Sequence, residues 1–292
     1  MKRFKNRLGR GAVGVLTLTA LMSLAFVIYF IIREALPLFA EVPLSEFLLG
    51  DRWMPIAFTG EPSFGIRNFL AGTLYVSVLA MLIASVTGIG AAVWLACVAD
   101  GNVRSWLYPL IDLLAGIPSV IFGLIGLTVL VPAFYRAGVH PGSCVLCASV
   151  VLAFMLLPYL VSACADTLVK LKKRYLPTAM GLGVSKWYAV TTVILPLSWK
   201  YLVTSLMLAV GRAMGETMAV MMVMGNANLF PSLLGKGETI AAVIALEMGT
   251  AENGSLHYHG LYAAGLVLLL LLFFIDLGMG ILRKVLLGEE EL

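Results

Sequence analysis

Long runs without a charged residue divide this 292-residue sequence and limit the folds open to it. Five runs reach or exceed the ~20 apolar residues that cross a bilayer core of about 30 Å. They cover residues 11–32, 68–99, 113–135, 137–165 and 253–275. A sixth apolar stretch, residues 200–226, carries Arg212 and Glu216 near its middle. The sequence therefore predicts six membrane-spanning helices.

The composition supports the same class of protein. Hydrophobic residues make up 61% of the chain and charged residues 12%, with a mean hydropathy of +0.98. Soluble domains hold about 45–50% apolar and about 25% charged residues. The runs are too long and unbroken for barrel strands, which alternate their faces over about ten residues. We therefore expect an all-α membrane protein, a bundle of six transmembrane helices.

The first apolar run follows a basic segment, KRFKNRLGR, and so resembles a secretion signal. Its 22 uncharged residues exceed the apolar core of a signal peptide, which runs to about 7–15 residues. We interpret it as a retained first helix.

Lysine and arginine are shared unequally between alternate loops. Five precede residue 11, one follows the second span, six lie in residues 166–200 and two follow the last span, against five in all the opposite loops. Because cytoplasmic loops carry the excess of basic residues, both termini should be cytoplasmic. The net charge of +4 reflects this bias, so no nucleic-acid partner is expected.

Proline and glycine mark the irregular segments. Four prolines in residues 33–70 favour short surface helices and loops on the external side. Residues 239–246 should form either a short helix or a reentrant piece over the outer mouth. The third span is interrupted by Gly116-Ile117-Pro118-Ser119, and proline there removes a helical hydrogen bond. Such broken helices are common in transport pathways, although a packing kink without a ligand is an equal alternative.

Two charges within the sixth stretch are the main functional candidates. A lipid-facing arginine at the bilayer centre costs about 2.5–3.5 kcal/mol on insertion scales, so Arg212 should face protein or water. Arg212 and Glu216 are four residues apart and would share one helical face. A permanently buried ion pair is the structural alternative. Gly211 and Gly215 have the GxxxG spacing that presses a helix against a partner.

No metal site is expected. Cys144 and Cys147 form a single CxxC without a second one, and His257 and His259 are two apart, which is wrong for one helical face. The four cysteines are interpreted as small apolar packing residues.

The loop after the fourth span resembles the cytoplasmic coupling loop of type I ABC importer permeases. The family pattern is Glu-Ala-Ala, three residues, Gly, nine residues, Ile, one residue, Leu-Pro. Gly183, Leu195-Pro196 and Ala179 match it, whereas Pro177 stands in place of Glu. The resemblance implies that this loop, about residues 170–199, docks on an ATPase subunit. Here we expect two short helices separated by Gly181 and Gly183 and ended by Pro196.

Three further segments resemble the phosphate-specific branch of this family, closest to its PstC-type subunits. They are GRAMGETMAVMMVMGNAN at 211–228, LLAGIPSVIFGLIGL at 113–127 and ALEMGTAENGSLHY at 245–258. The resemblance implies an importer permease fold of the MetI-like type, with residues 1–67 as N-terminal tail, first helix and periplasmic segment, 68–284 as the permease domain and 285–292 as a cytoplasmic tail.

The same resemblance implies a multi-pass subunit of the bacterial inner membrane that carries inorganic phosphate. Its partners would be a PstA-type second permease subunit, two ATP-binding subunits and a periplasmic phosphate-binding protein. The chain would bind no cofactor, because ATP and Mg²⁺ would sit on the ATPase partners. Its pathway residues would be Arg212, Glu216, Thr217 and Ser119, since a planar guanidinium matches the oxygens of an oxyanion.

Other functions stay open at this point. The cargo of such a permease could be another oxyanion or a small solute such as an amino acid. An ion-coupled carrier could instead use Arg212, Glu216 and Asp276 as a charged relay, but it would have no use for a docking loop. The chain holds no GxxxxGK[ST] phosphate loop and no paired His, metal-spaced carboxylates or Ser-His arrangement in its spans, so we do not expect an enzyme.

Overall fold

A computed structural model describes residues 2–56 and 61–287 of the chain. Six helical segments of this described part are long and apolar enough to cross a membrane, which confirms the predicted number. They are Gly11–Glu41, Arg67–Val98, Ser119–Arg136, Val145–Gly181, Lys186–Met214 and Leu256–Leu282.

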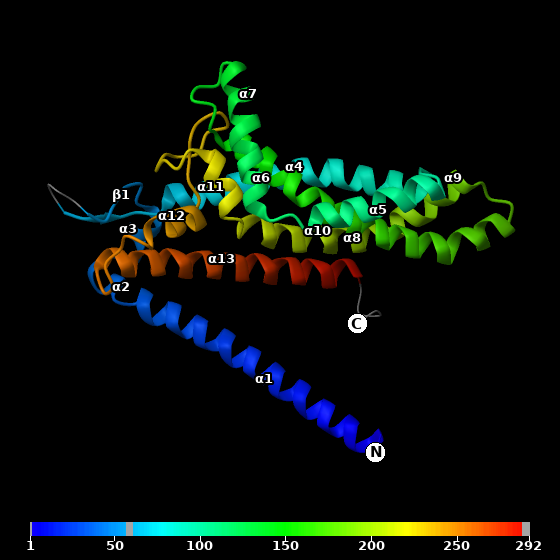
Figure 1. Cartoon of the computed structure of the whole chain (residues 1–292), viewed down its shortest axis with the longest axis horizontal. Helices are drawn as coiled ribbons and strands as arrows, with labels where there is room; N and C mark the ends of the chain where they lie inside the picture. Colours follow the sequence, from blue (N-terminus) through cyan, green and yellow to red (C-terminus); the bar gives the residue numbers. More distant parts are fainter. Residues whose placement is uncertain (1, 57–60, 288–292) are drawn as a thin grey trace.

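The spans and the helices that adjoin them run on into one another or are broken (Figure 1). In chain order they are α1 (Lys2–Ala35), α4 (Arg67–Val93) with the π-helical turn η1 (Trp94–Val98), α5 (Gly101–Ala115), α6 (Ser119–Ile125) with η2 (Gly126–Leu130) and α7 (Val131–Arg136), α8 (Val145–Gly181), α9 (Lys186–Ala189) with η3 (Val190–Ile194), α10 (Leu195–Met214), α11 (Met218–Met224) and α13 (Leu256–Leu287).

Helix α8 is the centre of the bundle and packs against α4, α5, α10 and α11. Small residues on α4 allow the close approach: Ala84 and Ala92 are fully buried, and a Cβ built on Gly88 would lie 3.3 Å from Leu160 Cβ. All four cysteines are buried and free, as expected of packing residues. Cys144 also caps α8, because its sulfur accepts from Cys147 N at 3.4 Å.

Helix α1 diverges from the bundle and meets the start of α13 at its own C-terminal end (Figure 1). There the ring of Phe30 packs edge-on against Tyr262, with 5.6 Å between the centroids. The apolar side chains of α1 from Val13 to Val27 are exposed. This helix therefore depends on lipid or on another chain to cover it.

The external segments fold as short elements over the end of the bundle. They are α2 (Leu38–Glu41), α3 (Leu44–Leu49), a hairpin of β1 (Trp53–Met54) and β2 (Ser63–Phe64) that pairs Trp53 with Phe64, and α12 (Ile240–Glu247). Phe47, Phe64 and Phe69 form a second core beneath them. The short surface helices are thus confirmed, as is the short helix that was one of the two alternatives for residues 239–246.

The loop after α8 differs from the expected pair of short helices. Helix α8 continues to Gly181, the chain reverses at Gly183 with φ +80°, and Ser185 caps α9 by accepting from Tyr188 N at 3.3 Å. Pro196 was expected to end a helix because proline has no amide hydrogen. It lies instead in the first turn of α10, where the wider turn of η3 precedes it and the helix continues. The loop is therefore the tip of one long helical hairpin.

Helix α1 begins and α13 ends toward the end of the bundle that holds the α8–α9 turn, while β1 and α12 lie at the other end (Figure 1). The side of the membrane that each end faces stays a prediction, as does the proposed division into segments. The last five residues of the tail expected over 285–292 lie outside the described part of the chain.

Candidate functional site

The helix expected over residues 200–226 is interrupted at its middle. Helix α10 ends at Met214 and α11 begins at Met218. Gly215 closes α10 by donating its amide to Gly211 O at 3.2 Å. The carboxylate of Glu216 then turns toward α11, where its Oε1 accepts from Ala219 N at 3.1 Å. A carboxylate in this position stabilises the start of a helix, so Glu216 is a cap for α11 rather than a second charge on α10.

A second interruption separates α5 from α6, where the sequence predicted it. Gly116 N donates to Leu113 O at 3.2 Å and ends α5, and Pro118, with ψ 139°, turns the chain before α6 starts at Ser119. Contrary to the sequence prediction, Pro118 does not remove a hydrogen bond from within a helix, because it precedes the first turn of α6.

The restarted helices α6 and α11 lie against each other. A Cβ built on Gly123 would come within 2.9 Å of Ala219 Cα, and one on Gly126 within 2.8 Å of Val223 Cγ1. Since residue numbers on both helices increase together along this contact, the two helices are parallel. Counting back four residues from Gly123 and from Ala219 places Ser119 at the level of Gly215. The two helix breaks are therefore side by side.

Arg212 is one turn before the break in α10, and its side chain is exposed. Its guanidinium lies over the ring of Tyr159 on α8, 5.9 Å from the centroid. Among the described residues no carboxylate oxygen lies within 4.0 Å of Arg212, so the permanent ion pair with Glu216 is absent from this conformation. In the described part of the chain, this arginine inside a membrane-spanning helix lies against an aromatic face.

Two other side chains adjoin this region. Asp276 on α13 faces α10, with Oδ1 3.9 Å from a Cβ built on Gly211. The sequence analysis named Asp276 only as a member of a possible charged relay and did not place it beside the helix that carries Arg212. It missed Tyr159, which lies in an uncharged run and gives no signal. The neighbour of Gly211 within this chain is thus α13, and its proposed packing against a partner stays a prediction.

The two hydroxyl candidates are half-buried at the breaks. Thr217 Oγ1 donates to Gly215 O at 3.4 Å, and the hydroxyl of Ser119 makes no hydrogen bond to any residue that the structure describes. The register of α6 and α11 brings Ser119 near residues 215–217, but neither hydroxyl contacts Arg212.

A groove of about 270 Å³ runs between α4, α10 and α13. Its walls are apolar, with Leu74, Met81, Val210, Met214 and Ile275 among its lining residues. Because desolvating an anion against such walls is unfavourable, this groove does not suit an oxyanion. The polar candidates are at the two helix breaks instead.

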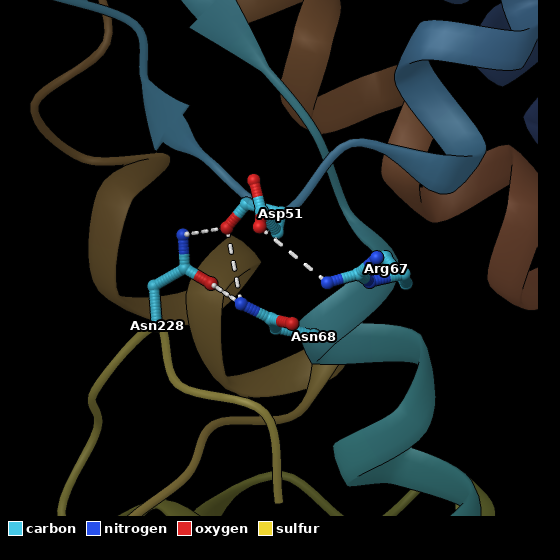
Figure 2. Close-up of polar contacts among 4 residues, drawn as sticks. All are labelled: Asp51, Arg67, Asn68 and Asn228. Atoms are coloured by element: carbon cyan, nitrogen blue, oxygen red, sulfur yellow. Dashed lines mark hydrogen bonds and ion pairs between the residues drawn. The ribbon is translucent and has the colours of Figure 1, made fainter.

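The external end of α11 is fixed by a polar cluster (Figure 2). Asn68 Nδ2 donates to Asp51 O at 3.0 Å and to Asn228 Oδ1 at 2.9 Å, and Asn228 Nδ2 donates to Asp51 O at 3.2 Å. Arg67 Nη2 lies 3.5 Å from Asp51 Oδ2. These contacts hold the segment after α11 against the start of α4. The C-terminal end of α11, the end away from the break, is therefore fixed in position.

The residues of the expected docking loop lie at the opposite end. Ala179 is in the last turn of α8, Gly183 in the turn, and Leu195 and Pro196 at the start of α10. The tip is covered with exposed apolar side chains, namely Met180, Leu182, Trp187 and Tyr188. Leu182 alone is 79% exposed. An apolar patch of this kind at the end of a hairpin is typical of a surface that another protein covers.

Comparison with known proteins gives matches of three kinds. The family model described as "Binding-protein-dependent transport system inner membrane component" matches residues 84–286. The chain is 37% identical over 232 residues to "Probable ABC transporter permease protein YqgH" of Bacillus subtilis, covering 78% of this chain and 74% of that one. It is 34% identical over 252 residues to "Phosphate transport system permease protein PstC" of Mesorhizobium japonicum, covering 79% and 75%.

A solved structure shares the fold. An inward-facing form of the MetNI methionine ABC transporter aligns with a TM-score of 0.57 at 16% identity, covering 73% of this chain and 92% of that chain. At this identity the likeness shows the fold alone.

Proposed function

Because this chain belongs to the binding-protein-dependent transport system inner membrane component family, we propose that it is the permease subunit of an ATP-driven importer of inorganic phosphate. The relatives of Mesorhizobium japonicum and Xylella fastidiosa that carry the name of a phosphate transport system permease support the cargo. The chain is then a transport subunit rather than an enzyme, and partner subunits hydrolyse ATP with Mg²⁺.

The observation that carries the proposal is the unpaired guanidinium of Arg212 beside two helix breaks. Arginine offers five N–H donors in a planar fork that matches two oxygens of a phosphate. No carboxylate of the described chain occupies these donors, and Glu216 is engaged with α11. Phosphate passing the breaks would therefore meet a cation whose donors are available.

The hydroxyls of Ser119 and Thr217 complete the proposed path. Both are at the interruptions, where irregular backbone leaves polar groups that a water-filled cavity can satisfy. When phosphate is absent, the ring of Tyr159 stabilises Arg212 through its π face. Glu216 keeps α11 in register with α6, which fixes the position of the second break.

The assembly that we propose contains a PstA-type second permease subunit, two ATP-binding subunits and a periplasmic phosphate-binding protein in a bacterial inner membrane. Coupling would pass through the helical hairpin that runs from the end of α8 to the start of α10, in which Ala179, Gly183, Leu195 and Pro196 match the family loop. Nucleotide binding on the partners would bias an equilibrium between inward-open and outward-open states. Gly211 and Gly215 would let α10 approach its neighbours closely.

Selectivity of uptake tests the proposed cargo. The complex is reconstituted in vesicles with its binding protein and internal ATP, and entry of labelled phosphate is followed with and without unlabelled sulfate or molybdate. We expect ATP-dependent uptake that excess unlabelled phosphate suppresses and sulfate and molybdate do not. Uptake of sulfate or molybdate in place of phosphate would reassign the cargo within the same family, and uptake without ATP would favour an ion-coupled carrier.

A further inference from the structure

The end of the bundle that holds the α8–α9 turn gathers positive charge from three helices. Arg104 on α5 and Lys186 on α9 each lie close enough to Lys172 on α8 to act on it electrostatically. They surround the last turn of η1, where the helix formed by α4 and η1 ends. None of these three residues belongs to the transport path proposed above.

Two of these cations converge on one backbone oxygen. Arg104 donates through Nε to Leu95 O at 3.1 Å and through Nη2 to Ala96 O at 2.6 Å. Lys172 Nζ donates to the same Ala96 O at 2.9 Å. Since both nitrogens reach one atom, they are no more than roughly 5.5 Å apart. Like charges at this distance repel unless an opposite charge lies between or beside them.

The protein supplies only part of that opposite charge. A helix C-terminus carries a partial charge of about −0.5, which favours cations but does not balance three of them. In the part of the chain that the structure describes, no carboxylate lies within 4.0 Å of Arg104, Lys172 or Lys186. The cluster is therefore left with net positive charge.

The unused donors define what would complete the cluster. Within the described part of the chain, Arg104 uses two of its five N–H groups and Lys172 uses one of its three. Lys186 is exposed and adds a third cation. Next to Arg104 on α5, the hydroxyl of Tyr108 is buried and has no partner among the described residues. Burial, with Asp166 contributing, raises the pKa of Tyr108, so its hydroxyl keeps its proton and remains a donor.

We propose that Arg104, Lys172 and Lys186 bind a phosphoryl oxyanion at the end of the helix formed by α4 and η1. A phosphoryl group carries several strong acceptor oxygens, and charge-assisted bonds from arginine and lysine are the contacts that such oxygens favour. The group is the headgroup of an anionic phospholipid or free inorganic phosphate. The span Arg67–Val98 ends at this cluster, which places it at headgroup depth.

Occupancy of the site would add a polar link between segments that already pack on one another through apolar side chains. The anion would bridge the turn between η1 and α5 to α8 and, through Lys186, to the first residue of α9. The α8–α9 turn would thereby be held against the bundle. The site is independent of Arg212 and of the cargo.

Binding to matched variants tests the inference. The assembled complex is purified in detergent, and its thermal unfolding is followed as phosphatidylglycerol or inorganic phosphate is added at constant ionic strength. Phosphatidylcholine and chloride serve as the neutral-lipid and salt references. Lys172→Gln and Lys186→Gln remove one cation each, while Lys173→Gln removes the same charge from an exposed neighbouring position of α8.

We expect saturable stabilisation by phosphatidylglycerol, by phosphate or by both, which identifies the source of the phosphoryl group. Each site variant should weaken the apparent affinity about tenfold, the effect of one charge-assisted hydrogen bond, and Lys173→Gln should leave it unchanged. Equal binding by Lys172→Gln, Lys186→Gln and the wild-type complex would overturn the proposal, as would equal stabilisation by chloride. The Arg212→Ala complex should still bind the phosphoryl group, because Arg212 is not part of this site. The binding result therefore does not depend on whether the transport proposal holds.

Discussion

The contact between α6 and α11 gives a quantitative prediction for Gly123→Ala. A Cβ at residue 123 would lie 2.9 Å from Ala219 Cα and 2.8 Å from Met222 Sδ, whereas ordinary contacts begin at 3.4 Å. The methionine can move, but Ala219 Cα is backbone, so the two helices must separate by several tenths of an ångström. This separation would displace both helix breaks.

The size of the effect follows from two opposing terms. Replacing glycine by alanine inside a helix favours folding by about 1 kcal/mol. Overpacking a close contact costs about 1–3 kcal/mol. Gly90→Ala, in α4, is the matched control, because a Cβ there meets nothing within 4 Å. The helix term is common to both variants, so Gly123→Ala should be less stable than Gly90→Ala by about 1–3 kcal/mol.

The assay is denaturant unfolding of the purified complex together with phosphate uptake in vesicles. Gly90→Ala should match or exceed the wild type in stability and transport at the same rate. Gly123→Ala should be less stable and slower. Equal stability of the two alanine variants would refute the close packing of α6 on α11 and with it the alignment of the two breaks.

Three further predictions concern other parts of the chain. Burial, with Glu247 adding to it, raises the pKa of Glu238 from 4.5 to about 7, so the wild type should lose up to about 3 kcal/mol of stability as pH rises between these values. Glu238→Gln should remove this dependence in thermal unfolding at pH 5 and pH 8, and a parallel slope in both proteins would contradict it. Asn228→Ala removes hydrogen bonds to Asn68 and Asp51 O and should cost about 1–2 kcal/mol in denaturant unfolding, while no loss would show that the cluster is dispensable. Gly183→Val places a branched residue at φ +80° and should abolish co-purification of the ATPase subunits, whereas Gly181→Ala should retain it; recovery of the ATPase with both variants would argue against docking at this turn.

Much of the fold could be predicted because bilayer physics leaves few options. Uncharged runs of sufficient length predicted five of the six spans, and the apolar stretch around Arg212 and Glu216 predicted the sixth. Pro118 predicted the break before α6, since proline cannot donate within a helix. The short external elements followed from the prolines of residues 33–70. The family followed from the loop around Gly183 and the segment 211–228.

The break before α11 could not be predicted from the same rules. Gly215 and Glu216 are compatible with a continuous helix, and only the capping of Ala219 N by Glu216 shows that the chain restarts there. Spacing of four residues predicted that Arg212 and Glu216 share a face, but that holds only along one unbroken helix. The aromatic neighbour Tyr159 depends on how α8 packs against α10, which no local pattern reveals.

The continuation of α10 through Pro196 has a similar origin. A proline predicts a helix end when the preceding turn is a regular α-turn. The wider turn of η3 removes that constraint, and a single sequence gives no sign of where such a turn forms.

Uptake by Arg212→Ala tests the central claim most directly. The variant, Arg212→Lys and the control Arg136→Ala, which removes an arginine from the end of α7, are reconstituted with all partners and internal ATP. Initial rates of labelled phosphate entry are compared at equal amounts of assembled complex. We predict a loss of about a hundredfold or more for Arg212→Ala, an intermediate rate for Arg212→Lys, which keeps the charge but not the fork, and a wild-type rate for Arg136→Ala. Wild-type uptake by Arg212→Ala would contradict the assignment of this guanidinium to the path of the anion.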